Sequence, residues 1–253
     1  MVSLALDNKV AVITGGSRGI GAATVRMFCA AGARVLFNYL RARDTAETLA
    51  RECGTERCVA VQADLSGTAS GEALVRAAVE RFRRLDILVA NHGIWPPEDA
   101  PIDRMSDEQW RSTLSINLDS VFSLVKHSVA QMKKQGSGGH IVLVSSTAGQ
   151  RGEAFHADYA ATKGAVISLV KSLATELGPS GIRINAVAPG WVLTDMSRAA
   201  IAAGEAAIRN AIPLRRVAEA EDVAGPVVFL ASPLARHITG EVLNVNGGSV
   251  LAG

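Results

Sequence analysis

Seven short runs of β-branched and other apolar residues, spaced along the whole chain, constrain its fold more than any other feature. Each run is almost continuously apolar, and a stretch with helical periodicity separates it from the next run. Buried strands of a parallel sheet have this pattern, because helices cover both of their faces. The runs occupy residues 9–14, 33–38, 58–63, 86–91, 140–146, 182–188 and 241–246. The pattern predicts an α/β fold, a doubly wound parallel sheet of about seven strands.

The stretches between these runs predict the helices. Amphipathic spacing indicates helices at 19–31, 43–53 and 70–84, and "SDEQ" at 106–109 offers a capping box that starts a long helix reaching about residue 134. Pro226 lies inside the last helical pattern, and proline removes a backbone hydrogen bond at a cost of roughly 3 kcal/mol, so we expect a kink there. No linker, repeat or low-complexity tract interrupts the chain, which predicts a single domain over 1–253.

Charge and hydropathy exclude several classes of partner. The 26 basic and 24 acidic residues give a net charge of +2 that is spread along the chain, so no nucleic-acid partner is expected. The basic segment "RFRRL" at 81–85 ends a helical pattern, where cations complement the helix dipole. No apolar stretch approaches the ~18 residues of a membrane span, and the N-terminus lacks the features of a signal peptide. We therefore expect a cytoplasmic protein without membrane contact.

The metal-binding residue types show no ligand pattern. Cys29, Cys53 and Cys58 are odd in number and form no C-x-x-C motif, and the five histidines are scattered. We expect neither a disulfide framework nor a metal site, and interpret the cysteines as buried or spare thiols.

The segment "TGGSRGIG" at 14–21 follows the first apolar run and opens the first helix. Gly15 permits a tight turn, Gly19 lets backbone amides approach a pyrophosphate, and Gly21 lets helix and strand pack closely. Gly15, Ser17 and Gly19 also satisfy the G-x-S-x-G elbow of serine hydrolases, with His237 and Asp195 as scattered partners. That elbow needs earlier strands, and only one precedes it here, so dinucleotide binding is the favoured interpretation.

The end of the second run bears on the choice of cofactor. An acid there favours NAD, whereas this chain has Asn38, with Arg41 following and Arg18 in the glycine loop to pair with a 2′-phosphate. We favour NADP(H), and Asp44 nearby keeps NAD(H) open. Asp64, at the end of the third run, can accept a hydrogen bond from the adenine amine.

A tyrosine and a lysine stand four residues apart in "HADYAATKGAV", 156–166. On a helix Tyr159 and Lys163 share a face, and the ammonium is expected to lower the phenol pKa from ~10. Ser146, at the end of the preceding run, can hold a carbonyl oxygen while the phenol donates its proton, and Asn117 can order a water toward the lysine. This combination is far more specific than any of its parts.

At this point the chain resembles the classical short-chain dehydrogenase/reductase family over nearly its whole length. The stretches that carry the resemblance are "TGGSRGIG", "LVANHG" (88–93), "SINL" (115–118), "VSSTAG" (144–149), "YAATK" (159–163), "NAVAPGWVLTD" (185–195) and "ITGEVLNVNGG" (238–248). The resemblance implies a Rossmann-type fold and a catalytic tetrad of Asn117, Ser146, Tyr159 and Lys163, with Ser146 and not Ser145 at the family spacing. One departure is visible: the family's Asn-Asn-Ala-Gly reads Ala90-Asn91-His92-Gly93 here, so an amide is lost at Ala90 and a bulkier imidazole stands at His92.

By the same resemblance, Asn91 and Gly93 flank the adenine side, Val192 and Thr194 touch the nicotinamide carboxamide, and Lys163 also holds the ribose hydroxyls. The full set of expected cofactor residues is Gly15, Ser17, Arg18, Gly19, Ile20, Gly21, Asn38, Arg41, Asp64, Leu65, Asn91, Gly93, Tyr159, Lys163, Pro189, Gly190, Val192 and Thr194.

Within the family, the C-terminal half looks most like 3-oxoacyl-carrier-protein reductases. That implies hydride transfer between NADP(H) and a ketone or secondary alcohol, possibly a thioester-linked acyl group; sugar, steroid and cyclic-alcohol dehydrogenases are the alternative. A catalytically silent dinucleotide-binding regulator is a more remote one. Ser180 replaces the basic residue that would grip a carrier protein, which weakens the case for carrier docking.

The substrate side is expected to be apolar. Ile94, Trp95, Trp191 and Met196 are predicted pocket walls, and the segment at about 194–216 is predicted to be a helical lid over the substrate. We therefore expect a modest-sized ketone with an apolar flank. Small and apolar residues on most of the helix that begins near Tyr159 should bury a second face, and the resemblance implies that this face joins a homotetramer.

Overall fold

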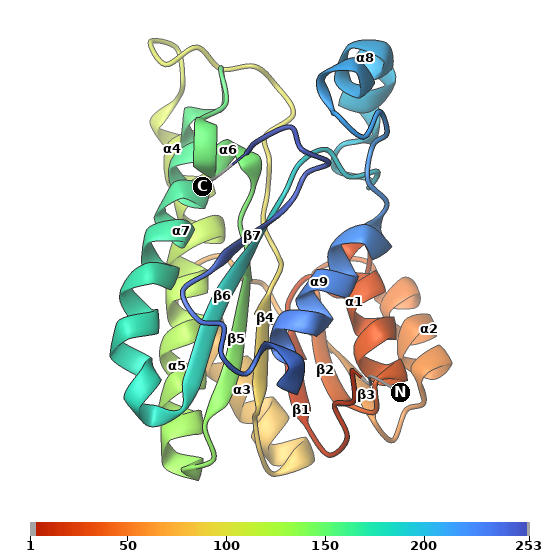
Figure 1. Ribbon diagram of the computed structural model, residues 1–253, viewed down its shortest axis with the longest axis vertical. Coiled ribbons are helices and arrows are strands. Elements are labelled where there is room, and N and C mark those ends of the chain that lie inside the picture. The colour runs from red at the N-terminus through yellow and green to blue at the C-terminus, as the bar shows by residue number, and fades with distance from the viewer. Residues whose placement is uncertain (1–3, 252–253) are drawn as a thin grey trace.

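A single seven-stranded sheet, with all strands parallel, organises the molecule (Figure 1). The computed structural model describes residues 4–251. The strand order is β3-β2-β1-β4-β5-β6-β7. The strands are β1 Val10–Ile13, β2 Arg34–Tyr39, β3 Cys58–Gln62, β4 Ile87–Ala90, β5 Gly139–Val144, β6 Ile182–Pro189 and β7 Val242–Val245. All seven predicted runs are therefore strands, and the doubly wound parallel sheet is confirmed.

Two helical layers cover the sheet, and each layer packs on its own hydrophobic core. Side chains alternate between the faces: Ala11 and Ile13 of β1 join the core under α1, α2 and α9, whereas Val10 and Val12 join the core under α3, α5 and α7. The helices are α1 Gly19–Ala30, α2 Arg43–Cys53, α3 Ala69–Phe82, α4 Asp107–Leu114, α5 Ser120–Gln135, α6 Thr147–Arg151, α7 Ala157–Leu177, α8 Arg198–Ala211 and α9 Ala220–Ala231. Short 3-10 turns lie at Gly178–Ser180 and Pro233–Ala235.

The predicted long helix from residue 106 is interrupted, which corrects the sequence interpretation. A π-helical turn, η1 (Ser115–Asp119), separates α4 from α5. Only half of the predicted capping box forms: the Ser106 hydroxyl accepts from the backbone NH of Gln109, but the Gln109 side chain donates to Asp158 instead. A complete box starts α9 at Glu219 and Asp222.

The kink that we expected at Pro226 is not where the backbone departs from helical geometry; the departure lies in the preceding helix, α8. α9 continues through Pro226 as one element. The non-helical dihedral angles lie in α8, at Gly204 (φ −136°). α8 projects beyond the carboxyl ends of the strands, and of its residues only Ile201 is buried (Figure 1).

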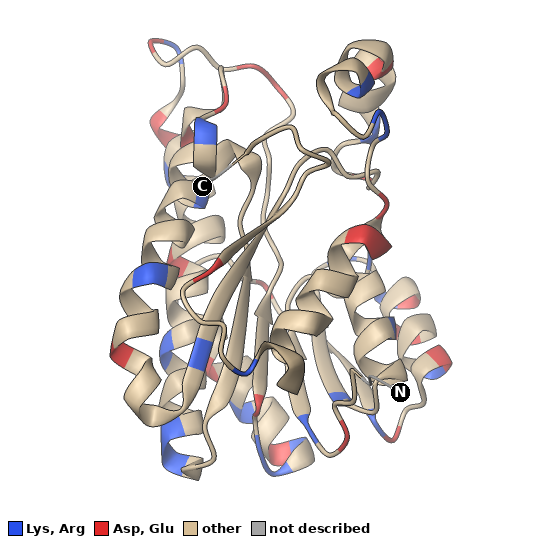
Figure 2. Ribbon diagram, in the orientation of Figure 1, with Lys and Arg blue, Asp and Glu red and all other residues tan. Residues whose placement is uncertain are grey.

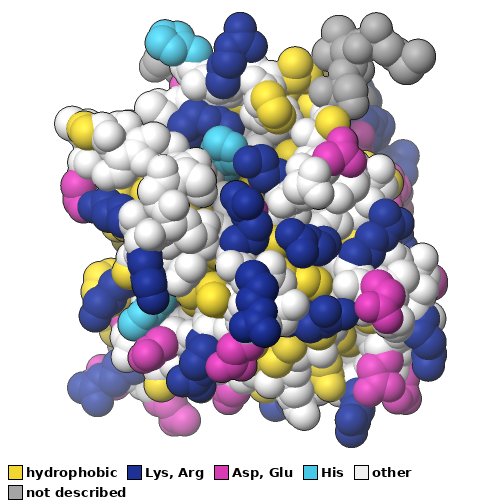
Figure 3. Space-filling view, turned by 90° about the horizontal axis from the view of Figure 1, so that it is seen from below, with side chains coloured by type: hydrophobic (Ala, Val, Ile, Leu, Met, Phe, Trp, Pro, Cys, Tyr) yellow, Lys and Arg dark blue, Asp and Glu magenta, His cyan; other side chains and the backbone are white. Residues whose placement is uncertain are grey.

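Charges of both signs lie on the outer helices and loops (Figure 2). Seen from the amino ends of the strands, Lys and Arg gather on that face (Figure 3). Some basic residues lie in the last turn of a helix, as Lys133 and Lys134 do in α5, where cations complement the helix dipole. Lys9 and Arg84 both pair with the buried Asp86, so part of this charge is neutralised within the chain. Within residues 4–251, no helix combines the length and apolarity that a membrane crossing requires.

The direction in which successive strands are added to the sheet reverses between β1 and β4, and this topological switch point determines where the site lies. The chain winds outward from β1 to β3 on one side and then returns to β4 on the other. Loops after β1 and β4 therefore diverge at the carboxyl edge, the place where ligands bind in open α/β sheets.

Candidate active site

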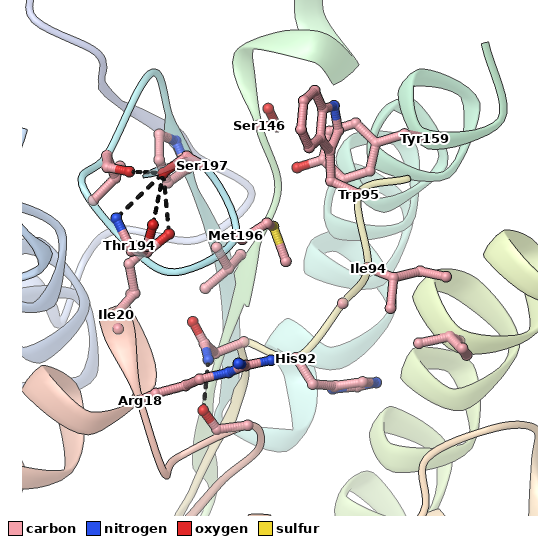
Figure 4. A pocket seen from close by; sticks show the side chains of 18 of the residues that line it. Arg18, Ile20, His92, Ile94, Trp95, Ser146, Tyr159, Thr194, Met196 and Ser197 are labelled. Atoms are coloured by element: carbon pink, nitrogen blue, oxygen red, sulfur yellow. Dashed lines mark hydrogen bonds between the residues drawn. The ribbon is translucent and has the colours of Figure 1, made fainter. Parts of the chain in front are cut away.

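A cavity of about 730 Å³ opens at this carboxyl edge. Its walls come from the loops that follow six of the seven strands, together with the first turns of α6 and α7. Figure 4 shows Arg18 and Ile20 on one side of the cavity and Ser146, Tyr159 and Trp95 on the other. All the predicted cofactor residues line it except Gly21.

The glycine loop has the geometry that its sequence predicts. Gly15 (φ +64°) and Gly19 (φ +52°) adopt the left-handed conformation that favours glycine. Gly21 lies behind the loop, where an added Cβ would meet the Gly15 carbonyl oxygen at 2.1 Å. The loop therefore holds the N-terminus of α1 toward the cavity, as a phosphate-binding turn requires.

The Asn38 side chain supports the loop and is not free to read a ribose. Its Oδ1 accepts from the backbone NH of Gly15 (2.8 Å), and its Nδ2 donates to the carbonyl of Ala63 (3.0 Å). Asn38 thus ties together the loops after β1, β2 and β3. From the sequence we inferred only that position 38 lacks a carboxylate. The two hydrogen bonds of the Asn38 amide, to Gly15 and to Ala63, are seen only in the structure.

The two arginines at the adenosine end line the cavity. The Arg18 side chain is 70% exposed, and its guanidinium lies 3.7 Å from the Asp195 carboxylate, a weak surface pair. Arg41 precedes α2, next to Tyr39 and Leu40 in the same wall. Asp64 also lines the cavity, but one of its oxygens accepts from the backbone NH of Ser66 (2.8 Å), the local turn that a strand-end Asp often makes.

Two adjacent serines after β5 have different environments. The buried Ser145 donates to the backbone carbonyl of Lys163 (2.8 Å) and joins β5 to α7. The Ser146 oxygen accepts from the backbone NH of Ala148 (3.1 Å), and its hydroxyl is the hydrogen-bond partner that lowers the pKa of the Tyr159 phenol. This difference supports the prediction that Ser146 is the reactive serine.

The predicted effect of Lys163 on the Tyr159 phenol is wrong for this structure. Burial raises the pKa of Tyr159 to about 12, a hydrogen bond with Ser146 opposes the increase, and the Glu153 carboxylate adds to it. The Lys163 Nζ lies 5.6 Å from the centre of the Tyr159 ring, but its short hydrogen bond goes to the Val144 carbonyl (2.8 Å). Desolvation outweighs the shared helix face that the sequence indicated.

Lys163 itself is a buried amine, 5% exposed. Burial lowers its pKa to about 8. A side chain at Gly93 would lie 3.5 Å from this Nζ and 3.1 Å from the Asn117 Oδ1, so glycine leaves room for both groups.

Asn117 lies in the π-helical turn and holds the loop after β4. Its Oδ1 accepts from the backbone NH of Ile94, and its Nδ2 donates to the Ile94 carbonyl, both at 2.8 Å. Its main hydrogen bonds are therefore structural, and only the second lone pair of Oδ1 remains to accept from a water. π-Helical turns often occur at functional sites, and nothing in the helical periodicity of "SINL" indicated one.

His92, the departure from the family pattern, is a bridge that sequence reasoning missed. Its Nδ1 is 2.7 Å from the Thr14 hydroxyl, and its Nε2 is 2.6 Å from the Ser120 hydroxyl. Because Ser120 donates to the Ile116 carbonyl, Nε2 carries the proton and Nδ1 accepts from Thr14. Burial lowers the pKa of His92 to about 3, consistent with a neutral ring. The bridge joins the strand before the glycine loop to the helix after the π-helical turn.

The four predicted pocket residues Ile94, Trp95, Trp191 and Met196 all line the cavity. Trp95 stacks on His156 (4.6 Å between ring centres) and meets Trp191 edge-on (6.3 Å). Its indole NH donates to the Glu153 carboxylate (3.1 Å). Glu153 and Arg151 also line the cavity and were not predicted, so the wall is more polar than the sequence indicated.

The serine hydrolase alternative has no assembled triad. Ser17 lines the cavity after β1, whereas His237 lies in the loop that leads into β7, at the amino edge of the sheet. Asp195 pairs with Arg18 and Arg198 instead.

Comparison with known proteins gives a consistent result. A family model described as Enoyl-(Acyl carrier protein) reductase matches residues 15–249. An L-rhamnose 1-dehydrogenase (NAD(P)(+)) of Azotobacter vinelandii is 41% identical, over 96% of this chain and 97% of that protein. A 3-oxoacyl-[acyl-carrier-protein] reductase of Synechocystis sp. is 38% identical, over 98% of this chain and 99% of that protein.

Two solved structures from Brucella melitensis share the whole fold. One, titled Short-chain dehydrogenase/reductase SDR: Glucose/ribitol dehydrogenase, aligns with a TM-score of 0.92 at 35% identity, over 99% of this chain and 100% of that chain. The other, a 3-ketoacyl-(acyl-carrier-protein) reductase complexed with NADH, gives 0.90 at 34% identity, over 98% and 100%. Fold, motifs and relatives agree, and the chain belongs to the short-chain dehydrogenase/reductase family of NAD(P)(H)-dependent oxidoreductases.

Proposed function

We propose that the protein transfers hydride between a nicotinamide dinucleotide and a ketone or secondary alcohol, with Tyr159 as the proton donor and acceptor. The observation that carries this proposal is that the glycine loop and the Ser146–Tyr159 pair open into one cavity. A silent dinucleotide-binding protein has no need for a proton donor at that place.

The residues of the cavity fit a dinucleotide. The glycine loop offers backbone NH groups to a pyrophosphate, and Val192 and Thr194 line the opposite, nicotinamide side. When bound, the dinucleotide supplies or accepts the hydride; the remaining steps belong to this chain. Lys163 would hold ribose hydroxyls after exchanging its hydrogen bond to Val144 for them.

The proton chemistry follows from the side-chain environments. Ser146 can turn its proton from the Tyr159 oxygen to the substrate oxygen, which fixes that oxygen beside the Tyr159 phenol. Tyr159 then gives its proton to the oxygen as negative charge develops there. The amine of Lys163, with a pKa of about 8, is the nearby group that can return a proton near neutral pH.

We assign NADP(H) as the preferred cofactor. Arg18 and Arg41 line the adenosine end, and no carboxylate ends β2, because Asn38 stands there with its amide bound to Gly15 and Ala63. A 2′-phosphate would gain two guanidinium partners, whereas a ribose 2′-hydroxyl would lack its usual acceptor.

The first candidate substrate class is a 3-oxoacyl thioester or a similar modest-sized ketone with an apolar flank. Ile94 and Met196 supply apolar wall, and the 3-oxoacyl reductases among the relatives favour this class. The predicted lid, now seen as α8 and its flanking loops, would close over it.

A sugar is the second candidate, and one observation favours it. Trp95 presents an aromatic surface next to the Glu153 carboxylate, with Arg151 in the same wall. Sugars use such a pairing, an apolar face against a ring and hydroxyls against charged groups. The relative named L-rhamnose 1-dehydrogenase points to the same class.

A substrate panel tests both candidates. β-Ketoacyl thioesters and cyclic ketones would be assayed for NADPH and NADH oxidation, and sugars with NADP⁺ and NAD⁺ for reduction. We expect turnover of the thioesters with NADPH favoured. Turnover of sugars alone would select the second candidate, and the absence of substrate-dependent NADPH or NADH oxidation and of NADP⁺ or NAD⁺ reduction with every member would contradict the proposed activity.

We also propose a homotetramer in which α7 forms part of an interface. α7 has 21 residues, of which only six are buried by its own chain. Phe122 on the neighbouring α5 is 52% exposed, which adds to the uncovered apolar area. Size-exclusion chromatography with light scattering measures the molar mass in solution and tests this assembly. A monomer mass at micromolar concentration would contradict it.

A further inference from the structure

The three cysteines of the chain meet inside one core, although they are far apart in the sequence. Cys29 lies near the end of α1, Cys53 ends α2, and Cys58 begins β3. All three are buried, and their Sγ atoms lie within 4.8 Å of one another. The cluster lies toward the amino edge of the sheet, whereas the cavity opens at the carboxyl edge.

The spacing suits a single thiophilic centre. Bonds of about 2.3 Å from one ion to three sulfurs place those sulfurs at most about 4 Å apart, so a pair at the 4.8 Å limit must close by at least about 0.8 Å on binding. Two of the sulfurs belong to residues at element ends, Cys53 before Gly54 and Cys58 at the first position of β3, where the backbone can adjust.

The net charge of the product decides which centre fits. The surrounding core is apolar, and a buried net charge is costly unless it is paired. Zn²⁺ with three thiolates would leave one negative charge and one open coordination position. Among the described residues, no fourth His, Cys, Asp or Glu belongs to the group.

Arg57 and Arg26 are the arginines whose charges reach the cluster, and of these two Arg26 is held in an ion pair. Arg57 donates to the Cys53 carbonyl (2.9 Å), and Arg26 forms a 2.9 Å ion pair with Glu52. A trivalent centre bound to three thiolates is neutral and three-coordinate, so it needs neither a counter-ion nor a fourth ligand.

The cluster lies close to the surface beside β3, where Cys58 is 1% exposed and Cys53 is 8% exposed. A small surface cavity is lined by Cys58, with Ala50, Thr55 and Ala60 among its other walls. A small neutral hydroxide such as arsenous acid can enter there without carrying charge into the core.

We propose that Cys29, Cys53 and Cys58 form a three-thiol binding site for a trivalent thiophilic metalloid, of which arsenite is the probe. In the binding step three As–OH bonds break and three As–S bonds form. Each thiol proton leaves with a hydroxide as water, so three waters are released and arsenic stays in its trivalent state. The site is independent of the proposed hydride-transfer activity.

Native mass spectrometry of the reduced full-length protein with arsenite tests this site. We expect one arsenic per chain, with a mass increase equal to one arsenic less three hydrogens, and a parallel loss of all three titratable thiols. The bound protein should also melt at a higher temperature, because ligand bound only to the folded state stabilises it. No adduct, or an adduct that leaves one thiol titratable, would overturn the proposal.

Single variants provide the matched controls, since every cysteine of the chain is in the cluster. Cys29→Ala, Cys53→Ala and Cys58→Ala should each bind arsenite at least tenfold more weakly, with folding checked by circular dichroism. Any folded variant with wild-type affinity would show that two thiols suffice and would contradict the three-thiol site. Zn²⁺ alone is the second probe, and tighter binding of Zn²⁺ than of arsenite would contradict the trivalent assignment.

Discussion

The proposed catalytic group and the cysteine cluster both consist of buried titratable side chains, but their surroundings differ. Each brings titratable side chains together from separate elements, and burial disfavours the charged form of both, raising the pKa of Tyr159 to about 12 and that of Cys53 to about 11. Ser146, Tyr159 and Lys163 open into a large cavity with polar partners. The cysteines have mainly one another as partners, inside an apolar core.

The two sites differ in the polar and charged groups that surround the buried side chains, and these groups determine which ligand each site can bind. Around Tyr159, a hydrogen bond from Ser146 and a lysine one helical turn away can offset desolvation once a ligand replaces water. Around the cysteines the nearby charges are those of Arg57 and Arg26, and Arg26 is already paired with Glu52, so a ligand that ends neutral fits best. The four predictions that follow test this contrast, from the largest expected effect to the smallest.

Tyr159→Phe should have the largest effect, because it removes the proposed proton donor and keeps the ring. We expect kcat for carbonyl reduction to fall by roughly 10²–10⁴-fold, the usual contribution of a positioned acid. The dissociation constant for NADPH, measured by fluorescence titration, should change less than threefold, roughly under 0.7 kcal/mol. Unchanged turnover would remove Tyr159 from the mechanism.

Lys163→Met should change how stability depends on pH. The pKa of Lys163 falls from 10.5 to about 8 on folding, so the unfolded chain binds more protons between pH 8 and 10.5 and the wild type gains stability as pH rises through that window. Below pH 8 the burial penalty is fully present, roughly 3 kcal/mol. The Lys163→Met variant does not have this burial penalty. It also loses the hydrogen bond to the Val144 carbonyl.

Urea unfolding of both proteins without cofactor at pH 7 and pH 10 measures the effect. The stability difference between wild type and variant should shift toward the wild type by up to about 3 kcal/mol at pH 10. A constant difference across this range would mean that Lys163 titrates normally and that burial does not control it.

His92→Ala restores the residue that the family pattern has and removes the bridge between Thr14 and Ser120. We expect a loss of about 1–3 kcal/mol at pH 7, since two buried hydroxyls lose a partner. The folded-state pKa of about 3 lies below the unfolded value of 6.5, so this advantage should shrink as pH falls below 6.5.

Calorimetry of the two proteins at pH 7 and pH 5 checks the sign of that pH dependence. The rate profile between pH 7 and pH 9 should keep its shape, because a neutral ring does not titrate there. A variant as stable as the wild type at both pH values would show that the bridge contributes nothing.

Elements with strong local signals were predictable from the sequence. Seven apolar runs became seven strands, and α2 was expected at 43–53, where it lies. The glycine loop was also predictable, because Gly15 and Gly21 have backbone and packing requirements that few other residues meet. Ser146, Tyr159 and Lys163 followed from spacing and family resemblance, and all three line the cavity.

Features that depend on tertiary contacts were not predictable. The periodicity around Asn117 is helical, and the π-helical turn shows only when its amide is seen to clamp Ile94. Helix spacing places Lys163 near Tyr159 but says nothing of the Val144 carbonyl that takes its hydrogen bond. The cysteines gave no motif, since sheet order and not sequence distance brings Cys29 beside Cys58.

Cys58→Ala should have the smallest effect on catalysis and is the counterpart of Ser146→Ala, since each change deletes one side-chain atom beyond Cβ. At Cys58 the deletion leaves a small void in an apolar core, and we expect a stability loss of about 1 kcal/mol with kcat unchanged. At Ser146 it removes the proposed donor to the substrate oxygen, so kcat should fall by roughly 10²–10³-fold, with a stability loss of about 1 kcal/mol because the cap of α6 is lost. Steady-state kinetics and urea unfolding of the two variants separate these effects. A kcat loss in Cys58→Ala comparable to that in Ser146→Ala would mean that the core behind β3 and the cavity are coupled, and the contrast between the two regions would fail.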